Sequence, residues 1–233
     1  MTSQSFTSHD GLKISYEIID ECEGEYLLLH TGLNSTKEAW KELSYVDEFK
    51  NDFKIILIDP RGHGESDKPR DLAKYSYKKM ADDVAALLDH LGIQKIYYFG
   101  YSLGALIGWR FAQFHQERLI CLVAGGSRIR YPKDYTNVFL RLQFLKEGEI
   151  INEDIPFKPT DVESFLPSLK IPVLIFSGEE DQSTISSVPE FAKALPNCTS
   201  FTIPGLNHPQ TIMQKEKVLP QIKDFLIKVQ KSK

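Results

Sequence analysis

The segment GYSLG, from Gly100 to Gly104, places one serine between two glycines. An apolar run typical of a buried strand comes directly before it, and an apolar stretch typical of a helix follows. The spacing Gly-x-Ser-x-Gly is typical of a nucleophile elbow, a tight strand-to-helix turn that projects the serine oxygen from the sheet. Larger side chains at the two glycine positions would collide with the neighbouring strand and helix. The pattern therefore predicts that Ser102 is a nucleophile, the alternative being a structural turn without chemistry.

A serine hydroxyl needs an adjacent base to attack a substrate near neutral pH. Among the six histidines of the chain, His208 lies in the loop "IPGLNHPQ", after the extended run "CTSFTI" and before the last helical stretch. This position gives the order serine, acid, histidine that accompanies the elbow. We therefore expect His208 to be the general base, the alternative being a loop histidine without a catalytic role.

The acid that orients the histidine is expected after the strand that precedes the histidine loop. The segment "IPVLIFSGEEDQST" offers Glu179, Glu180 and Asp181 directly after an apolar run. The spacing Gly-x-x-Asp puts the carboxylate of Asp181 past the turn, where it can reach an imidazole, so Asp181 is the predicted acid and Glu180 the alternative. An earlier strand ends in "VAGGS", which contains no carboxylate and strengthens this choice.

Attack on a carbonyl group generates an oxyanion, which preorganised N–H groups stabilise. One predicted donor is the backbone N–H of Leu103, the residue after the nucleophile, at the positive end of the helix dipole. The second is expected from the loop "HTGLNSTKEAW", with the N–H of Gly32 or of Leu33 as candidates. His30 in the same segment is expected to hold the shape of this loop through hydrogen bonds.

These residues must be held by a sheet, and the sequence alternates strand-like and helix-like segments, opening with a hairpin signal at Asp10-Gly11. The alternation predicts a mostly parallel sheet with helices on both faces, in which ligands bind beyond the carboxyl ends of the strands. Helices are predicted from 35, with a capping box of Ser35 and Glu38, from 75 to Gly92, and from 210 to 231. Strands are predicted at 26–30, 53–59, 95–100, 119–125 and 171–178.

The segment from 128 to 168 breaks this rhythm because it is aromatic, charged and punctuated by proline. An insertion of roughly 40 residues is too long for an ordinary connection, so we expect a small helical cap over the strand ends. The predicted organisation is a core of residues 1–127 and 169–233 with a cap at 128–168. Aromatic residues are expected to pack within the cap, an acyl pocket being the alternative: Tyr131, Tyr135, Phe139, Phe144 and Phe157. Basic residues are expected on a solvated face, a site for an anionic substrate being the alternative: Arg128, Arg130, Lys133 and Arg141.

Composition and charge argue against several classes of protein. The chain has 233 residues, 42% hydrophobic and 26% charged, which suits one domain with a sizeable core. A formal net charge of −4 argues against a nucleic-acid-binding protein. The start of the chain lacks the features of a secretory signal, and no apolar run reaches membrane-spanning length. Cys22, Cys121 and Cys198 argue against a disulfide framework or a zinc site, so a cytoplasmic location is expected.

Five segments resemble motifs of the α/β-hydrolase family, in the family's order and over nearly the whole chain. They are "LLLHTGLNSTKEAW" for the oxyanion loop, "LIDPRGHGESDKP" for the loop after the next strand, "GYSLGA" for the elbow, "IPVLIFSGEED" for the acid strand and "IPGLNH" for the histidine loop. The resemblance implies the α/β-hydrolase fold, with Ser102, His208 and Asp181 as nucleophile, base and orienting acid. The chain departs from the family in having Thr31 between the histidine and glycine of the usual His-Gly pair, so both candidates for the second donor stay open.

The segment "DPRGHGES" contains Asp59, Arg61, His63 and Glu65, a set that raises the alternative of a metal site. In a chain that resembles the hydrolases, we expect these side chains to fix a loop. The chain contains no phosphate-loop motif and no dinucleotide fingerprint after an opening strand. No metal and no organic cofactor is therefore predicted.

The chemistry that these residues predict is acyl transfer through an acyl-enzyme intermediate. We expect a hydrolase of small or medium carboxylic esters. A lactonase, a thioesterase and a C–C bond hydrolase are alternatives with the same mechanism, and a non-catalytic small-molecule receptor on the same fold is an alternative of another class. Members of the family that open epoxides or remove halogens use a carboxylate nucleophile, so the serine of the elbow argues against those reactions.

Overall fold

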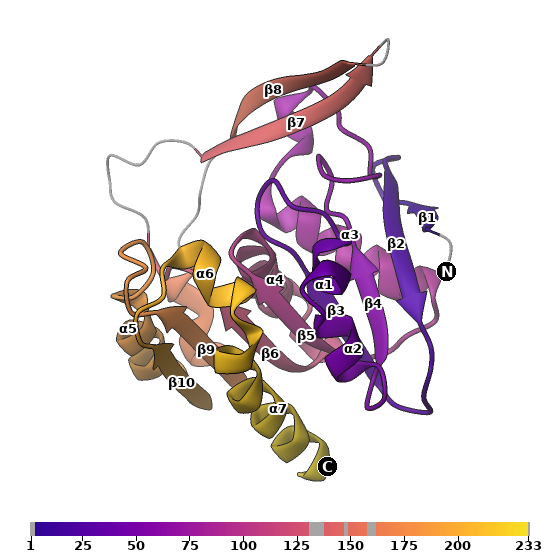
Figure 1. The fold of residues 1–233 in the computed structure, drawn as a ribbon. Helices are drawn as coiled ribbons and strands as arrows, with labels where there is room; N and C mark the ends of the chain where they lie inside the picture. Colours follow the sequence, from indigo (N-terminus) through magenta and orange to yellow (C-terminus); the bar gives the residue numbers. More distant parts are fainter. Residues whose placement is uncertain (1–2, 131–137, 147–148, 158–161, 233) are drawn as a thin grey trace.

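The computed structural model describes residues 3–130, 138–146, 149–157 and 162–232. An eight-stranded sheet with the order β1-β2-β4-β3-β5-β6-β9-β10 forms its centre (Figure 1). The pairings from β4 to β10 in this order are parallel, whereas β1 with β2 and β2 with β4 are antiparallel. The predicted mostly parallel sheet opened by a hairpin is confirmed. The strands are β1 (Gln4–Thr7), β2 (Lys13–Ile19), β3 (Tyr26–His30), β4 (Lys54–Ile58), β5 (Ile96–Tyr101), β6 (Leu119–Gly125), β9 (Val173–Gly178) and β10 (Cys198–Ile203).

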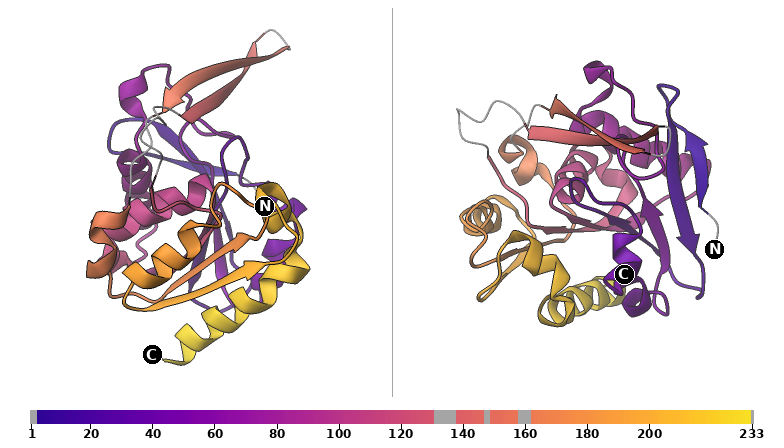
Figure 2. Two further views of the ribbon diagram at one scale, coloured as in Figure 1. Left: turned by 90° about the vertical axis from the view of Figure 1, so that its left-hand side faces the viewer. Right: turned by 45° about the horizontal axis from the view of Figure 1, so that its top comes forward.

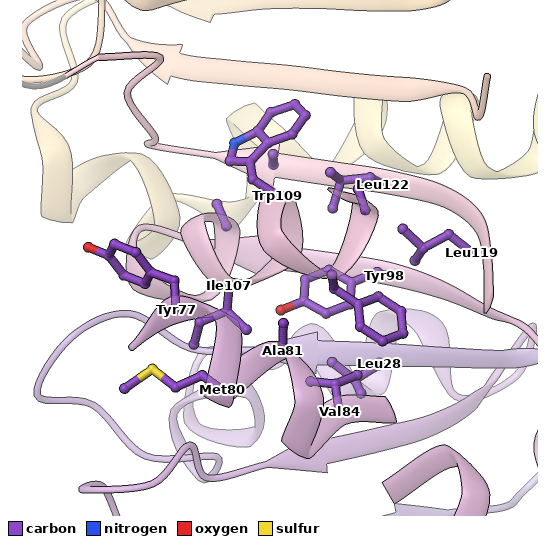
Figure 3. Close-up of a cluster of buried hydrophobic side chains, with 14 of the residues drawn as sticks. Leu28, Tyr77, Met80, Ala81, Val84, Tyr98, Ile107, Trp109, Leu119 and Leu122 are labelled. Atoms are coloured by element: carbon purple, nitrogen blue, oxygen red, sulfur yellow. The ribbon is translucent and has the colours of Figure 1, made fainter. Parts of the chain in front are cut away.

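Helices cover both faces of this sheet, as two further views show (Figure 2). Successive side chains of a strand point to opposite faces of the sheet, so the sheet has a core on each face. In β3, Leu28 packs in one core, and Leu27 and Leu29 pack in the other. In the first core, Val84 and Ile107 bring two helices together over the sheet (Figure 3). The helices of the first core are α3 (Tyr77–His90), α4 (Leu103–Phe114) and α5 (Ser187–Ala194), and those of the second are α1 (Ala39–Glu42), α2 (Tyr45–Phe49) and α7 (Lys215–Lys231).

Local sequence sets both ends of α3. At its start, the side chain of Ser76 accepts a hydrogen bond from the N–H of Lys79 at 3.1 Å. At its end, Gly92 has a φ of 68°, a left-handed conformation that glycine adopts without steric cost. The N–H of Ile93 then donates to the carbonyl of Leu88 at 2.9 Å, which closes the helix as in a Schellman motif. The predicted end of this helix at Gly92 is confirmed.

The first predicted helix is divided into α1 and α2, and its predicted capping box is wrong. The residue before α1 is Glu38, whose side chain makes no capping hydrogen bond, so Ser35 is not the cap. Ser44 separates the two helices with a φ of 57°. Trp40 and Tyr45 are both buried and their rings lie 5.2 Å apart, edge to face. In one continuous helix these two residues would lie on different faces, so the interruption lets both reach the core.

The last predicted helix is also divided, into α6 (His208–Met213) and α7. Gln214 separates them with φ of −93° and ψ of 65°, outside the helical region. Because α6 begins at His208, this histidine occupies the first position of a short helix of its own rather than a loop.

The insertion predicted as a helical cap is built differently in the part that the structure describes. β7 (Val138–Lys146) and β8 (Glu149–Phe157) form an antiparallel two-stranded sheet, and the 3-10 helix η3 (Glu163–Ser168) follows. The helical prediction is wrong for these strands. The reason is visible in the sequence, where apolar and polar residues alternate through "LRLQF" and only two residues separate the strands.

The β7–β8 hairpin lies beyond the carboxyl ends of the parallel strands, apart from the central sheet (Figures 1 and 2). The side chains from 131 to 161, which include the aromatic residues assigned to the cap, lie outside the described part. Two of the assigned basic residues are described, and Arg128 is half-buried whereas Arg130 is exposed. The Arg130 guanidinium pairs with Glu163 at 2.5 Å and with Glu190 at 2.6 Å. The boundaries of the cap stay a prediction.

The loop after β4 is held by Arg61, which is 2% exposed. Its guanidinium donates two hydrogen bonds to Asp83 of α3, at 2.8 and 2.6 Å, and two to Asp10 in the first hairpin turn, both at 3.0 Å. Burial raises the pKa of Asp83 although the guanidinium acts in the opposite direction, so the carboxylate depends on Arg61 for compensation of its charge. Arg61 therefore fixes this loop, as expected from the sequence, and joins it to α3.

The replacement Arg61→Met is expected to lower the free energy of unfolding by about 3–5 kcal/mol, because it leaves the buried Asp83 carboxylate without its partner. Lys78→Met is the matched control, since the pair of Lys78 with Asp82 lies one helical turn apart at the surface. The control is expected to lose less than about 0.5 kcal/mol. Urea denaturation followed by circular dichroism measures both variants, and equal losses would contradict the role given to Arg61.

Candidate active site

The turn from β5 into α4 brings Ser102 to the carboxyl edge of the sheet. Ser102 has φ of 54° and ψ of −114°, a strained conformation for a residue with a side chain. A Cβ on Gly104 would lie 2.1 Å from the carbonyl oxygen of His30, and a Cβ on Gly100 would lie 2.4 Å from the carbonyl of Gly104. The glycines are therefore needed for the close packing of helix and strands, as the sequence predicts.

His208 reaches Ser102 from the first position of α6. Its Nε2 atom lies 3.0 Å from Oγ of Ser102. A capping box fixes the start of this helix, because Asn207 accepts a hydrogen bond from the N–H of Gln210 and the Gln210 side chain accepts one from the N–H of Asn207, both at 3.1 Å. The imidazole is thus held on a rigid turn beside the hydroxyl.

Asp181 lies behind the imidazole and is 3% exposed. Its Oδ2 atom is 2.5 Å from Nδ1 of His208 and accepts a hydrogen bond from the hydroxyl of Thr184 at 2.5 Å. Its Oδ1 atom accepts hydrogen bonds from the N–H and the hydroxyl of Ser183. Burial acts to raise the pKa of Asp181, but the hydrogen bonds from His208, Ser183 and Thr184 outweigh it and hold the pKa below its usual value. Glu180, the alternative acid, is exposed.

Two residues that sequence reasoning missed also place the imidazole. The hydroxyl of Tyr101 donates to the backbone carbonyl of His208 at 2.5 Å, and the two rings lie 5.3 Å apart. Gly126 has a φ of 58°, and a Cβ there would lie 2.9 Å from Cε1 of His208. The double glycine in "VAGGS", at the end of a strand, was the available signal for such a close approach.

The sequence predicts that His30 holds the shape of the loop after β3, but the hydrogen bond of its side chain joins the end of β3 to the elbow. Its Nδ1 atom lies 2.6 Å from the hydroxyl of Tyr98, which donates to the carbonyl of Gly104 at 2.9 Å. Because one hydroxyl has one proton, His30 must donate its Nδ1 proton to Tyr98. Burial lowers the pKa of His30 to about 3, so its imidazole is neutral.

The three candidate oxyanion donors lie around Ser102. Leu103 is the first residue of α4, where an N–H has no partner within the helix. A Cβ on Gly32 would lie 3.4 Å from Cβ and 3.9 Å from Oγ of Ser102, so the Gly32 main chain lies against the Ser102 side chain. Leu33 follows it and lines the same cavity. The choice between Gly32 and Leu33 stays a prediction.

A cavity of about 290 Å³ opens beside the hydroxyl of Ser102. Most of its lining side chains are apolar and come from the loop after β3, from α1 and from α6. The lining residues are Thr31, Gly32, Leu33, Ser35, Ala39, Trp40, Leu43, Tyr101, Ser102, His208, Pro209, Ile212 and Met213.

The side chains considered for a metal site are engaged elsewhere. Asp59 pairs with Lys37 at 2.9 Å, and Arg61 pairs with Asp83 and Asp10. Within the described residues, no group of three or more histidine, cysteine, aspartate or glutamate side chains is placed to hold a metal ion. The contacts of this segment are those of a fixed loop.

No helix of the described part is long and apolar enough to cross a bilayer.

Comparisons with known proteins agree with this architecture. The family model for the alpha/beta hydrolase fold matches residues 26–159. The chain is 23% identical over a 280-residue alignment to a putative 2-succinyl-6-hydroxy-2,4-cyclohexadiene-1-carboxylate synthase of Bacillus subtilis, covering 98% of this chain and 100% of the relative. It is 29% identical to human epoxide hydrolase 4 over 64% of this chain and 41% of the relative. The structure of a thermophilic esterase from Thermogutta terrifontis superposes with a TM-score of 0.78 at 22% identity, covering 98% of this chain and 99% of the esterase.

The replacement Asp181→Asn is expected to slow the reaction of Ser102 with a fluorophosphonate probe by about 10³–10⁴-fold, because an amide neither stabilises an imidazolium nor keeps the correct tautomer of His208. Glu180→Gln is the matched control and is expected to react at the rate of the parent. The measurement is the second-order rate of labelling, with the modified residue located by mass spectrometry. A slow Glu180→Gln variant with a fast Asp181→Asn variant would reverse the assignment of the acid.

Proposed function

The chain belongs to the alpha/beta hydrolase fold family, and from its site we propose that it is a serine hydrolase that cleaves carboxylic esters. The observation that carries the proposal is the continuous contact from Asp181 through His208 to Ser102, at 2.5 and 3.0 Å. This geometry suits a nucleophile activated by a base that a third group orients.

In the proposed reaction, His208 accepts the proton of Ser102 while Oγ attacks the ester carbonyl. The resulting oxyanion is stabilised by the N–H of Leu103 and by that of Gly32 or Leu33. The intermediate collapses, the C–O bond to the alcohol breaks, and the proton passes from His208 to the leaving alcohol. His208 then activates a water molecule, which releases the acid and restores Ser102.

The nucleophile favours this reaction over the one named for the epoxide-hydrolase relative. Family members that open epoxides attack with a carboxylate, and the residue that stands at the elbow here is Ser102. Lactones, thioesters and C–C bonds remain alternatives, since the same three side chains serve each of them. A non-catalytic receptor on the same fold is the alternative of a different class.

The cavity favours an uncharged ester with a hydrocarbon part. Leu33, Trp40, Leu43 and Ile212 give its wall an apolar character, which suits alkyl groups rather than carboxylates. Its volume of about 290 Å³ lies at the lower end of the range for small-molecule sites, which fits small or medium substrates. We therefore propose short to medium alkyl esters as the substrate class.

Turnover of p-nitrophenyl butyrate with and without Ser102→Ala tests the proposed function. The variant is expected to lose at least about 10³-fold in kcat, because it removes the proposed nucleophile. A variant as fast as the parent contradicts the proposal. Fluorophosphonate labelling of the parent distinguishes an enzyme from a receptor, since a receptor needs no activated serine. Comparison of kcat/KM for esters, lactones and thioesters ranks the alternative substrates.

The size of the cavity gives a second test, based on chain length. Leu43→Trp is expected to lower the ratio of kcat/KM for p-nitrophenyl octanoate over acetate by at least about 10-fold, because the indole occupies space that the longer chain needs. Leu72→Trp is the matched control, since Leu72 is 47% exposed and lies in η1 (Leu72–Lys74). An unchanged ratio in Leu43→Trp would remove this cavity from substrate binding.

A further inference from the structure

The loop that carries Gly32 and Leu33 ends at a lysine with almost no contact with solvent. Lys37 is 1% exposed, and Asp59 is fully buried. The Nζ atom of Lys37 lies 2.9 Å from Oδ2 of Asp59, and it lies 2.6 Å from Oε2 of Glu65. A buried lysine is rare unless its charge is paired, and two carboxylates compensate this one.

Asp59 binds the main chain of this loop as well as the ammonium group. Its Oδ1 atom accepts a hydrogen bond from the backbone N–H of Lys37 at 2.7 Å, and its Oδ2 atom accepts one from the N–H of Glu65 at 3.0 Å. Asp59 follows β4, and its own N–H donates to the carbonyl of Ser15 in β2 at 3.0 Å. Through its carboxylate and its backbone N–H, Asp59 thus ties the far end of the loop to β4 and β2.

Packing leaves the Asp59 carboxylate little freedom to move. Gly64 has a φ of 48°, and a Cβ there would lie 2.2 Å from the carboxylate carbon. Only a residue without a side chain allows the backbone to approach so closely. The position of Asp59 is therefore fixed by sterics and by hydrogen bonds together.

The near end of the loop is fixed beside the nucleophile. His30 ends β3 opposite Gly100 of β5, in the register of the parallel pair. Between the two ends, the N–H of Ser35 donates to the carbonyl of Gly32 at 3.3 Å and closes a turn. The positions of the Gly32 and Leu33 N–H groups thus depend on both anchors.

Resting on the proposed function, we propose that Lys37 is a positioning residue, whose contacts with Asp59 hold this loop so that its N–H groups face the oxyanion. A buried ion pair often gives no more stability than apolar residues of the same size. A buried ion pair does, however, fix the relative position of its two charged groups. An N–H donor that must point at a developing charge needs a main chain fixed in this way. Lys37 touches neither the substrate nor Ser102 in this proposal, and it acts through Gly32 and Leu33.

The replacement Lys37→Met keeps a side chain of similar length and removes the ammonium group. We expect kcat to fall by about 10- to 100-fold, less than the 10²–10³-fold that follows the loss of an oxyanion donor, because the donors are displaced rather than removed. KM is expected to stay within about twofold, since the oxyanion forms only in the transition state.

Inhibition by n-butylboronic acid supplies a readout that a merely stabilising residue does not move. Addition of Ser102 to boron gives a tetrahedral adduct with an oxygen in the place of the oxyanion. The inhibition constant of Lys37→Met is expected to rise by the factor by which kcat/KM falls, because both depend on the same N–H groups. A purely stabilising lysine would lower the midpoint of urea unfolding and leave kcat and boronate inhibition of the folded enzyme unchanged.

Lys41→Met is the matched control. Lys41 lies one helical turn further along the chain and pairs with Glu17 of β2 at 2.5 Å. The substitution is the same and also removes a lysine from an acidic partner, but it leaves the anchor at Asp59 intact. Its kcat and its boronate inhibition are expected to stay within about twofold of the parent.

Parental kcat and boronate inhibition in Lys37→Met would overturn the proposal. If that variant does not fold, Glu65→Gln decides, because the Glu65 side chain is 63% exposed and its replacement weakens the hold on the ammonium group at the surface. A fall in kcat of about two- to fivefold is then expected, and an unchanged kcat overturns the proposal. If the parental enzyme neither turns over esters nor labels at Ser102, the proposed function is refuted, and the role of Lys37 with it. If the parent is active and the variant is unaffected, only the role of Lys37 is refuted.

Discussion

The close approach of α4 to the ends of β3 and β5 is the constraint on which the site depends. The main chain of Gly104 lies so near to the carbonyl of His30 that no side chain fits between them. Bringing the helix this close forces the intervening Ser102 to a positive φ, at a cost of about 1–3 kcal/mol. In return, the same turn points Oγ away from the sheet and brings the first N–H of α4 beside it.

His208 and Asp181 reach this hydroxyl through a second close approach, at the carboxyl end of β9, two strands away from β5 in the same sheet. A Cβ on Gly178 would lie 2.1 Å from the carbonyl oxygen of Leu206, so the turn after β9 lies directly against the segment that leads to His208. The N–H of Glu180 donates to that same carbonyl at 3.0 Å. The turn of Asp181 and the start of α6 are therefore one hydrogen-bonded unit, which holds the imidazole and its carboxylate together. The hydroxyl of Tyr101 joins this unit to the elbow.

The sheet and the three facing side chains could be predicted because their signals are local: an apolar strand followed by glycine and a polar residue. The rest depends on contacts between distant segments. The helix is interrupted at Ser44 because Trp40 and Tyr45 both pack in the core. A capping pattern in the sequence does not indicate this packing. The contact of Tyr101 with the carbonyl of His208 spans 107 residues. The alternation of apolar and polar residues in β7 is a local signal that predicts a strand. The length of the insertion alone does not distinguish a cap made of helices from one that contains a hairpin.

His208, the proposed base, differs in burial from His30 and His63, two histidines in other motifs of the chain. His30 and His63 are almost completely buried, and burial lowers their pKa to about 3 and about 4. A neutral imidazole of this kind donates a structural hydrogen bond but has no means of stabilising a proton gained during a reaction. His208 is 33% exposed and faces a carboxylate held ionised by its own hydrogen bonds. A positive charge on the His208 ring would face the Asp181 carboxylate, as the proposed role of general base requires while the oxyanion exists.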